Sequence, residues 1–172
     1  MTEPSDASTT PEEVANVLIL GVLEQMPVRV PDLSAHLARA GPIGHTLAGE
    51  DRILAEAIAA SLAVSLLPLE RRLSLEDLHG VHQGVHDYIE RMLPGLFLYV
   101  LAYYVAMCDL SGDARLEALG RTFRARCHGV EPEALVPDPS EDRALGARLV
   151  PRGHAPLADD IARLLRNAAL NR

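Results

Sequence analysis

The chain has 172 residues, and its 24 acidic against 16 basic residues give a formal charge of −8. This excess of carboxylates disfavours nucleic acid and anionic membranes as partners, because both of those surfaces attract positive charge. All of the basic residues are arginine, so Schiff-base and lysine general-base chemistry are excluded. The length suits a single domain, and a hydrophobic content of 48% is enough to form a core.

The cysteines and the first ten residues bear on the cellular compartment. Two cysteines, Cys108 and Cys127, are too few for a disulfide framework or a cysteine-rich zinc module. Residues 1–10 are polar and lack the apolar stretch of a signal peptide, so we expect a disordered tail on a cytoplasmic protein. The longest uncharged run, residues 92–108, is interrupted by a Pro-Gly pair and is too short to span a bilayer.

The first part of the chain carries helical patterns. Thr10 is followed by Pro11 and then by Glu13, which together form the signature of a capped helix start. We expect this helix to run to about residue 26, where Pro27 ends it. Two further helices are predicted over residues 31–40 and 46–67.

The helical pattern continues to residue 130. Ser74, followed by acidic residues at positions 76 and 77, predicts the start of a helix that extends to about residue 93. The pair Pro94-Gly95 then either kinks this helix or begins a new one that reaches Cys108. Another helix is predicted from about residue 113 to 128.

The last part of the chain differs in composition. Residues 131–156 hold five prolines and several charges, which predict a surface loop or linker. Within it, residues 149–153 (Leu-Val-Pro-Arg-Gly) resemble a thrombin recognition sequence. Residues 157–172 predict an amphipathic helix, whose apolar stripe contains Leu157, Ile161, Leu164, Leu165 and Ala168. The predicted fold is all-α, with about six helices, the bundle over 11–130, a Pro-rich loop and a tethered C-terminal helix.

One predicted helix carries a histidine-rich face. His79, His82, His86 and Glu90 fall within about 80° of one another on a helix. His82 and His86 have the i,i+4 spacing that lets two imidazoles bind one metal ion. The apolar stripe of this helix lies about 120° away, which puts the histidines at the boundary between core and solvent. This face predicts a divalent metal site, and the alternative is a polar helix edge with no cofactor.

A second candidate site lies on the apolar stretch that follows. Tyr99, Tyr103 and Met107 share one face of a helix over residues 95–108. Because this helix is apolar all round, we expect it to be buried on every side, including at Leu101. Each buried tyrosine hydroxyl then needs a hydrogen-bond partner. The three side chains are candidates to line an apolar ligand pocket or a subunit interface, and the alternative is ordinary core.

A third pattern lies near the end of the helix predicted over 113–128. The stretch from Arg121 to His128 resembles the R-x(4–6)-H motif of HEPN ribonucleases, which are all-α proteins of similar size. The resemblance implies that an arginine and a histidine assist attack by the 2′-hydroxyl of RNA. Arg72 and His79 have the same spacing. Cations at the end of a helix also interact favourably with its dipole, which explains the same residues structurally.

Residues 31–42 resemble the first half of a TetR-type helix-turn-helix. Residues 1–70 nevertheless hold ten acidic residues and only three arginines, whereas a DNA reader has to neutralise phosphates. We therefore interpret the segment as a corner between two helices and expect no nucleic-acid partner.

The functional expectation is a binding or regulatory protein rather than an enzyme. No nucleophile–base pair, glycine-rich phosphate loop or paired-carboxylate motif stands out in the sequence. The excess of apolar helix surface predicts contact with a protein partner or a second copy of the chain, or binding of an apolar small molecule. The alternatives are a metal-dependent enzyme or sensor that uses His82 and His86, and a HEPN-like ribonuclease.

Overall fold

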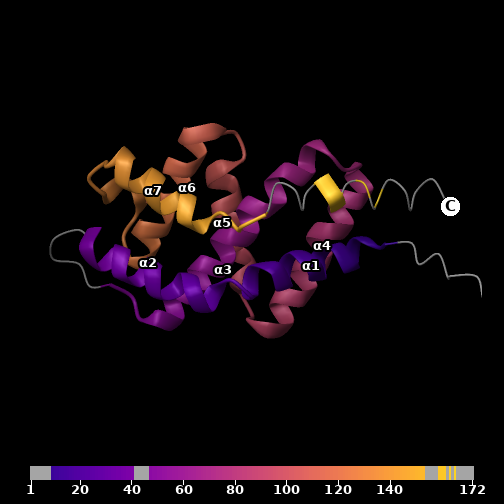
Figure 1. Cartoon of the computed structure of the whole chain (residues 1–172), viewed down its shortest axis with the longest axis horizontal. Coiled ribbons are helices and arrows are strands. Elements are labelled where there is room, and N and C mark those ends of the chain that lie inside the picture. Colours follow the sequence, from indigo (N-terminus) through magenta and orange to yellow (C-terminus); the bar gives the residue numbers. More distant parts are fainter. Residues whose placement is uncertain (1–8, 41–46, 154–158, 162, 164, 166–172) are drawn as a thin grey trace, which may run out of the picture.

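A computed structural model describes residues 9–40, 47–153, 159–161, 163 and 165 of the chain. These residues form helices and contain no strand, so the predicted all-α class is confirmed for them. The elements are α1 (Pro11–Leu23), α2 (Met26–Ala40), α3 (Glu50–Leu66), η1 (Leu67–Arg71), α4 (Leu75–Met92), α5 (Leu96–Met107), α6 (Gly112–Cys127), η2 (Pro132–Ala134) and α7 (Pro139–Leu149). Helices α1 and α2 follow one long side of the molecule, as Figure 1 shows.

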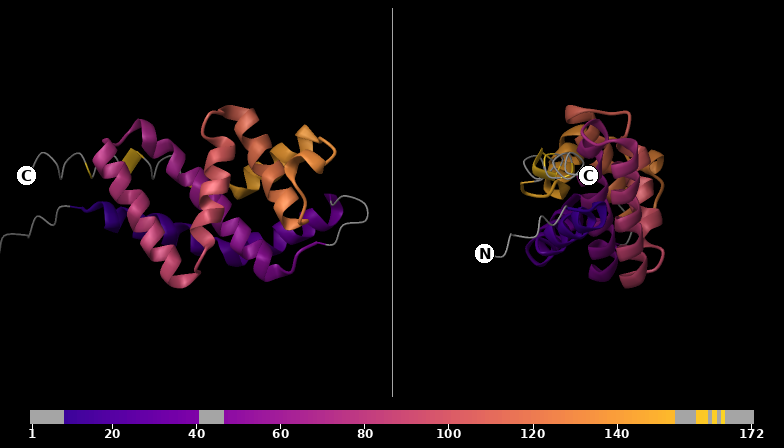
Figure 2. Two further views of the ribbon diagram at one scale, coloured as in Figure 1. Left: turned by 180° about the vertical axis from the view of Figure 1, so that it is seen from behind. Right: turned by 90° about the vertical axis from the view of Figure 1, so that its right-hand side faces the viewer.

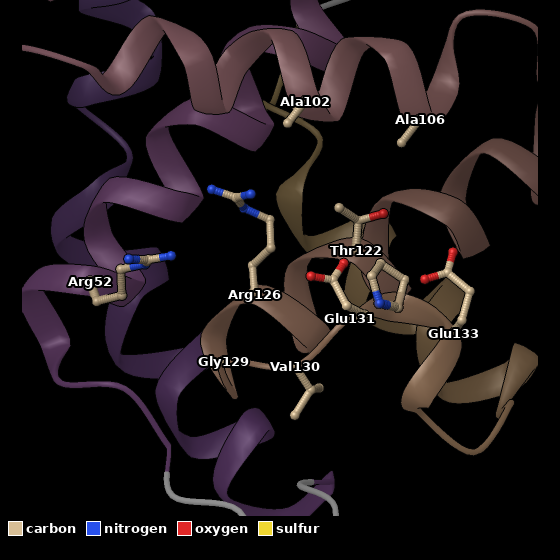
Figure 3. A pocket seen from close by; sticks show the side chains of 10 residues that line it. Arg52, Ala102, Ala106, Thr122, Arg126, Gly129, Val130, Glu131 and Glu133 are labelled. Carbon is tan, nitrogen blue, oxygen red and sulfur yellow. The ribbon is translucent and has the colours of Figure 1, made fainter.

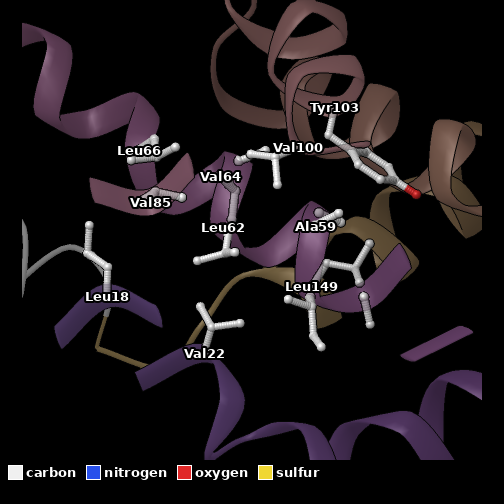
Figure 4. Close-up of a cluster of buried hydrophobic side chains, with 14 of the residues drawn as sticks. Leu18, Val22, Ala59, Leu62, Val64, Leu66, Val85, Val100, Tyr103 and Leu149 are labelled. Carbon is white, nitrogen blue, oxygen red and sulfur yellow. The ribbon is translucent and has the colours of Figure 1, made fainter. Parts of the chain in front are cut away.

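Helix α3 is the centre of the fold. Every residue from Glu56 to Leu66 is buried, and α3 contacts α1, α2, α5, α6 and α7. Its leucine and valine side chains meet those of α1 on one side and α5 on the other (Figure 4). Seen from behind, α4, α5 and α6 form the near face, and α1 and α2 lie beyond α3 (Figure 2). The central position of α3 explains its long run of small and aliphatic residues.

Among the residues that the structure describes, one continuous helical stretch is long and apolar enough to cross a membrane by length and composition. It covers Glu50–Arg71, and 78% of its most apolar window is buried inside the fold. Helices α1 and α2 together pass the same test but are bent by 52° at their junction. The core helix of a packed bundle has the same length and composition, and burial of α3 by its neighbours matches that description.

The predicted helix starts at Thr10 and Ser74 are confirmed. The Thr10 hydroxyl accepts a hydrogen bond from the backbone N–H of Glu13, and the Glu13 carboxylate accepts one from the N–H of Thr10. Ser74 accepts a hydrogen bond from the N–H of Asp77. Gly95 has a left-handed φ of 85°, so the chain turns sharply there and α5 is a separate helix from α4.

Two prolines act differently from the prediction. The chain breaks at residues 24 and 25 rather than at Pro27, and α2 begins at Met26. Proline is tolerated in the first turn of a helix because the N–H that it lacks would have no partner there. Pro31 was expected to begin a helix, but it lies inside α2.

The predicted loop over 131–156 is wrong for its central part, because α7 lies there. Asp138 accepts a hydrogen bond from the N–H of Glu141 and Pro139 occupies the first turn, so the same prolines and acids that indicated a loop start a helix. Leu145 and Leu149 of α7 are fully buried. The helix packs mainly on α6.

The predicted C-terminal helix falls mostly outside the described residues. Ile161 and Leu165, two members of its apolar stripe, are buried. Asp159 forms an ion pair with Arg72 at 2.7 Å. Outside the described part of the chain lie Leu157, Leu164, Ala168 and residues 1–8 of the N-terminal tail predicted over residues 1–10.

Candidate functional site

The four predicted metal ligands all lie on α4, and three of them contact α5 or the turn before it. The two oxygens of Glu90 accept hydrogen bonds from the backbone N–H groups of Gly95, at 2.9 Å, and Phe97, at 3.2 Å. The ring of His86 packs edge-on against Phe97, and its Nδ1 lies 2.9 Å from a carboxylate oxygen of Asp87. The Gly95 hydrogen bond is the main reason that the pKa of Glu90 is lowered. Glu90 therefore caps the start of α5.

The two remaining histidines differ in exposure. His79 is exposed, whereas the half-buried ring of His82 packs edge-on against Tyr104. Burial lowers the pKa of His82 from its usual value, so the neutral form is favoured. Within the described ranges, no three histidine, cysteine or acidic side chains are grouped to hold one metal ion. A metal at His82 and His86 stays a prediction.

The tyrosine face of α5 points into the fold. Tyr103 and Met107 are fully buried, and Tyr99 is half-buried. The hydroxyl of Tyr103 donates a hydrogen bond of 2.9 Å to the carboxylate of Glu56 on α3. Tyr103 thus has the partner that its burial requires. The partner is a carboxylate that we did not single out from the sequence.

Glu56 is the buried centre of a polar cluster that joins α3, α5 and α6. Its side chain is completely buried. Arg52 donates to one carboxylate oxygen at 2.8 Å, and Arg126 donates through Nε to the other at 2.7 Å. The ring of Tyr99 lies beside both guanidinium groups, at 4.4 Å from that of Arg126 and 5.1 Å from that of Arg52. We call Arg52, Glu56, Tyr99, Tyr103 and Arg126 the Glu56 cluster.

The Glu56 cluster holds one carboxylate between two guanidinium groups. Burying an unpaired carboxylate costs several kcal/mol, so Glu56 depends on its three donors. Burial and then the charge of Glu56 raise the pKa of Tyr103 well above its usual value, so the phenol stays protonated. Burial lowers the pKa of Arg126, but the hydrogen bond and charge of Glu56 outweigh this and leave it raised. The cluster therefore pairs one carboxylate with two guanidinium groups, which leaves one positive charge in excess.

Cys127 lies close to the Glu56 cluster but is chemically inert. Burial, followed by the charge of Glu56, raises the pKa of its thiol to about 12. A thiolate is the nucleophilic and metal-binding form of cysteine. At neutral pH the protonated Cys127 is a small buried side chain and not a nucleophile.

A cavity of about 470 Å³ opens beside the Glu56 cluster. The guanidinium groups of Arg52 and Arg126 lie on one side of it, and the carboxylates of Glu131 and Glu133 lie on the other, near Thr122 (Figure 3). Its lining consists of Arg52, Ala102, Ala106, Thr122, Arg126, Gly129, Val130, Glu131, Pro132 and Glu133. Tyr99, Tyr103 and Met107 are not part of this lining. The cavity is polar, in contrast to the apolar pocket expected on this helix.

An apolar groove of about 560 Å³ lies elsewhere on the surface. It is formed at the junction of α1 and α2, the first turns of α3, and the end of α4. Its lining consists of Leu23, Met26, Pro27, Val30, Pro31, Glu50, Asp51, Leu54, Ile58, Met92 and Leu93. Glu50 and Asp51, at the start of α3, are its charged members. The groove can receive an apolar side chain or helix with a cation nearby.

Helix α5 is not buried on every side, so the expectation for Leu101 is wrong. Leu98, Leu101 and Val105 are 67%, 40% and 72% exposed. We call these three side chains the outer face of α5. A helix that is surrounded by protein and a helix with one apolar face exposed to solvent cannot be distinguished from their sequences, because both lack charged residues.

The arginines in the HEPN-like stretch are all engaged in contacts within the fold. Arg121 donates to the backbone carbonyls of Pro132 and Leu135 and so fastens η2 to α6. Arg124 forms a buried ion pair with Asp142 of α7 at 2.8 Å. Arg126 belongs to the Glu56 cluster, and His128 is buried. A HEPN-like activity stays a prediction.

Comparison of the chain with protein-family models, with curated proteins and with solved structures gave no match. The function therefore has to be argued from the cavity, the groove and the exposed face of α5.

Proposed function

We propose that this chain is a non-catalytic helical binding protein that self-associates through the outer face of α5. Three exposed aliphatic side chains on α5 support the proposal. The helix that carries them, Leu96–Met107, has no charged residue. At about 100° per residue, Leu98, Leu101 and Val105 lie within an arc of roughly 60°. Adjacent apolar side chains on a helix surface are typical of contact sites.

A second copy of the chain is the occupant that best fits this face. In a two-fold symmetric contact the same surface meets itself, so the surface has to be complementary to itself. An aliphatic face without charge meets this condition, whereas a face with one sign of charge does not. The helix is about 18 Å long, so antiparallel packing of two α5 helices would cover all three side chains.

Sedimentation equilibrium of the purified chain and of a Leu98→Glu variant tests the proposal. We expect the unchanged chain to dimerise and the variant to be monomeric with the same circular dichroism spectrum. Leu75→Glu is the matched control, because Leu75 is 86% exposed and also lies in the first turn of a helix. A monomeric unchanged chain, or equal dissociation by both substitutions, would contradict the proposal.

The apolar groove supports a second candidate function, the docking of a partner helix. Leu54, Met92 and Leu93 are partly exposed there, and Glu50 and Asp51 lie beside them. These carboxylates favour a partner whose apolar helix face also carries an arginine or lysine.

A fluorescent peptide with a leucine face and flanking arginines tests this second function. We expect it to bind the chain, and the same peptide with glutamates in place of the arginines to bind much more weakly. Leu54→Ser should weaken binding, and Leu75→Ser, outside the groove, should not. Equal binding of the two peptides would refute the role of Glu50 and Asp51.

A metal-dependent function at His82 and His86 is one of the two alternatives predicted from the sequence. Recruiting Glu90 as a ligand would compete with its two hydrogen bonds to the start of α5. Elemental analysis of protein purified without a nickel column distinguishes this alternative from the proposed function.

A further inference from the structure

We propose that the cavity beside the Glu56 cluster binds a small zwitterion of amino-acid size, with its carboxylate on Arg126 and its ammonium group between Glu131 and Glu133. This site lies within one copy of the chain, so the proposal goes beyond self-association and does not depend on it. The placement of opposite charges on the two sides of one cavity carries the proposal (Figure 3).

Arg126 is held in one orientation, as a carboxylate-binding group should be. Its Nε is bound to Glu56 at 2.7 Å, and its guanidinium lies against the rings of Tyr99 and Tyr103. In the part of the chain that the structure describes, its two terminal nitrogens donate no hydrogen bond. A guanidinium fixed in this way presents parallel N–H donors that match the two oxygens of a carboxylate. Little conformational entropy is then lost on binding.

The backbone on the acidic side of the cavity is also held by the fold. Glu131 and Glu133 belong to the segment that includes η2, whose backbone is held to α6 by the hydrogen bond from Arg121 to Pro132 at 2.9 Å. The N–H of Ala134 also donates to the carbonyl of Glu131. The backbone that carries the two exposed carboxylates is therefore held across from the guanidinium groups, and the pair suits an ammonium group.

The charges of the cavity exclude simpler ligands. Glu131 and Glu133 would repel a small anion, and Arg52 and Arg126 would repel a small cation. A molecule with both charges satisfies both sides. Because the carboxylates of the cavity and the Glu56 cluster outnumber the guanidinium groups, an amino acid with a basic side chain should bind better than a neutral one.

The α5 wall of the cavity leaves space for the body of the ligand. It consists of Ala102 and Ala106, whose methyl groups provide an apolar surface. Larger side chains at these positions would fill part of the 470 Å³. The hydroxyl of Thr122 lies on the same side as Glu131 and Glu133 in Figure 3 and can serve as a further hydrogen-bond partner.

Isothermal titration calorimetry of the full chain with four probes tests the proposal. The probes are L-lysine, L-leucine, N-acetyl-L-leucine and L-leucinamide, and the last two each lack one charge of the zwitterion. We expect L-lysine to bind best, L-leucine next, and each blocked form at least about tenfold more weakly than L-leucine. Failure of both free amino acids to bind at millimolar concentration, or equal binding of a blocked form, would overturn the proposal.

Three variants distinguish the site from other surfaces of the chain. Glu133→Gln should weaken L-leucine binding by about tenfold, and Ala106→Leu should block it, while both keep the unchanged melting temperature within a few degrees. Glu76→Gln, on α4 and outside the cavity lining, is the control and should bind normally. Normal binding by both cavity variants would refute the assignment of the site.

The Leu98→Glu variant separates this proposal from self-association. Leu98 does not line the cavity, so a monomeric Leu98→Glu chain should still bind L-lysine. If the unchanged chain dimerises and the variant is monomeric and still binds, both proposals stand. If the unchanged chain is monomeric and binds, only self-association fails, and if it dimerises without binding any probe, only the zwitterion site fails.

Discussion

Gly120 of α6 and Gly146 of α7 lie against each other where the two helices cross. A Cβ atom on Gly120 would overlap the backbone carbonyl of Asp142, and one on Gly146 would overlap the carbonyl of Leu116. The two backbones therefore touch, and no larger residue fits at either position. The same crossing brings Arg124 and Asp142 together as a buried ion pair.

Gly146→Ala should therefore destabilise the chain by at least about 1–3 kcal/mol, the usual cost of overpacking, because backbone rather than a side chain has to move. Gly21→Ala is the matched control. Gly21 lies within α1, and a Cβ atom there would have no neighbour within 4 Å. Alanine should stabilise that position by about 0.5–1 kcal/mol. Urea denaturation should give opposite signs for the two variants, and equal signs would show that α6 and α7 do not cross as described.

Aspartate substitutions at two consecutive residues of α5 should reduce stability by very different amounts. Val100 is 1% exposed and Leu101 is 40% exposed. Val100→Asp places a carboxylate in the core and should cost about 3–5 kcal/mol. Leu101→Asp leaves its carboxylate in contact with water and should cost well under half as much. Thermal denaturation of the two substitutions, each made in the Leu98→Glu background so that neither variant dimerises, checks the orientation of α5, and comparable losses would refute it.

Only some parts of the fold could be predicted from the sequence. The caps at Thr10 and Ser74 depend on residues within four positions of each other, so local patterns were sufficient. Helix α7 carries the same kind of signal, Asp138 followed by Pro139, but the prolines around it suggested a loop. The exposure of Leu101 depends on which helices pack beside α5, and no local pattern contains that information.

Stability should fall on mild acidification, because of His82. Burial lowers its pKa below the usual value of 6.5, so the folded state binds the proton less tightly than the unfolded state. For a base with a lowered pKa, the stabilising contribution is present above pH 6.5 and is lost as the pH falls through the lowered pKa.

The free energy of unfolding, measured by urea denaturation at several pH values, checks this linkage. A His82→Gln variant should show a flatter dependence below pH 6.5 than the unchanged chain. The variant His79→Gln, at an exposed position of the same helix, should stay close to the original slope, because the charge of His79 is the smallest of the causes that act on the pKa of His82. If His82→Gln also keeps that slope, His82 is not the group responsible.

Thrombin should cut slowly at Arg152, although residues 149–153 resemble its recognition sequence. Arg29 donates to the backbone carbonyls of Leu149 and Val150, at 3.1 and 2.8 Å, and the N–H of Arg152 donates to the side chain of Gln25 at 2.9 Å. A protease requires an extended and accessible backbone. Arg29→Ala should speed cleavage several-fold in native buffer, and rapid cutting of the unchanged chain would show that these contacts do not hold.

The candidate site could be predicted only in part. The sequence places Arg52 and Glu56 four residues apart, and Glu56 is the single carboxylate in an otherwise apolar stretch, which is a readable sign of a special role. Tyr103 and Arg126 are 47 and 70 positions away from Glu56. Their meeting depends on how α5 and α6 pack on α3. The histidine face could be predicted from the spacing of its residues. The hydrogen bonds of Glu90 to the start of α5 could not, because they depend on the turn at Gly95.

Helix α5 contributes to both proposed sites, because Ala102 and Ala106 form a wall of the cavity while Leu98, Leu101 and Val105 point outward. If a bound amino acid shifts this helix, thermodynamic linkage requires the effect to be reciprocal: the factor by which the ligand changes dimer affinity equals the factor by which dimerisation changes ligand affinity. Apparent ligand affinity would then vary with the concentration of the protein itself, and a cell could tune the response by changing only the amount of this chain.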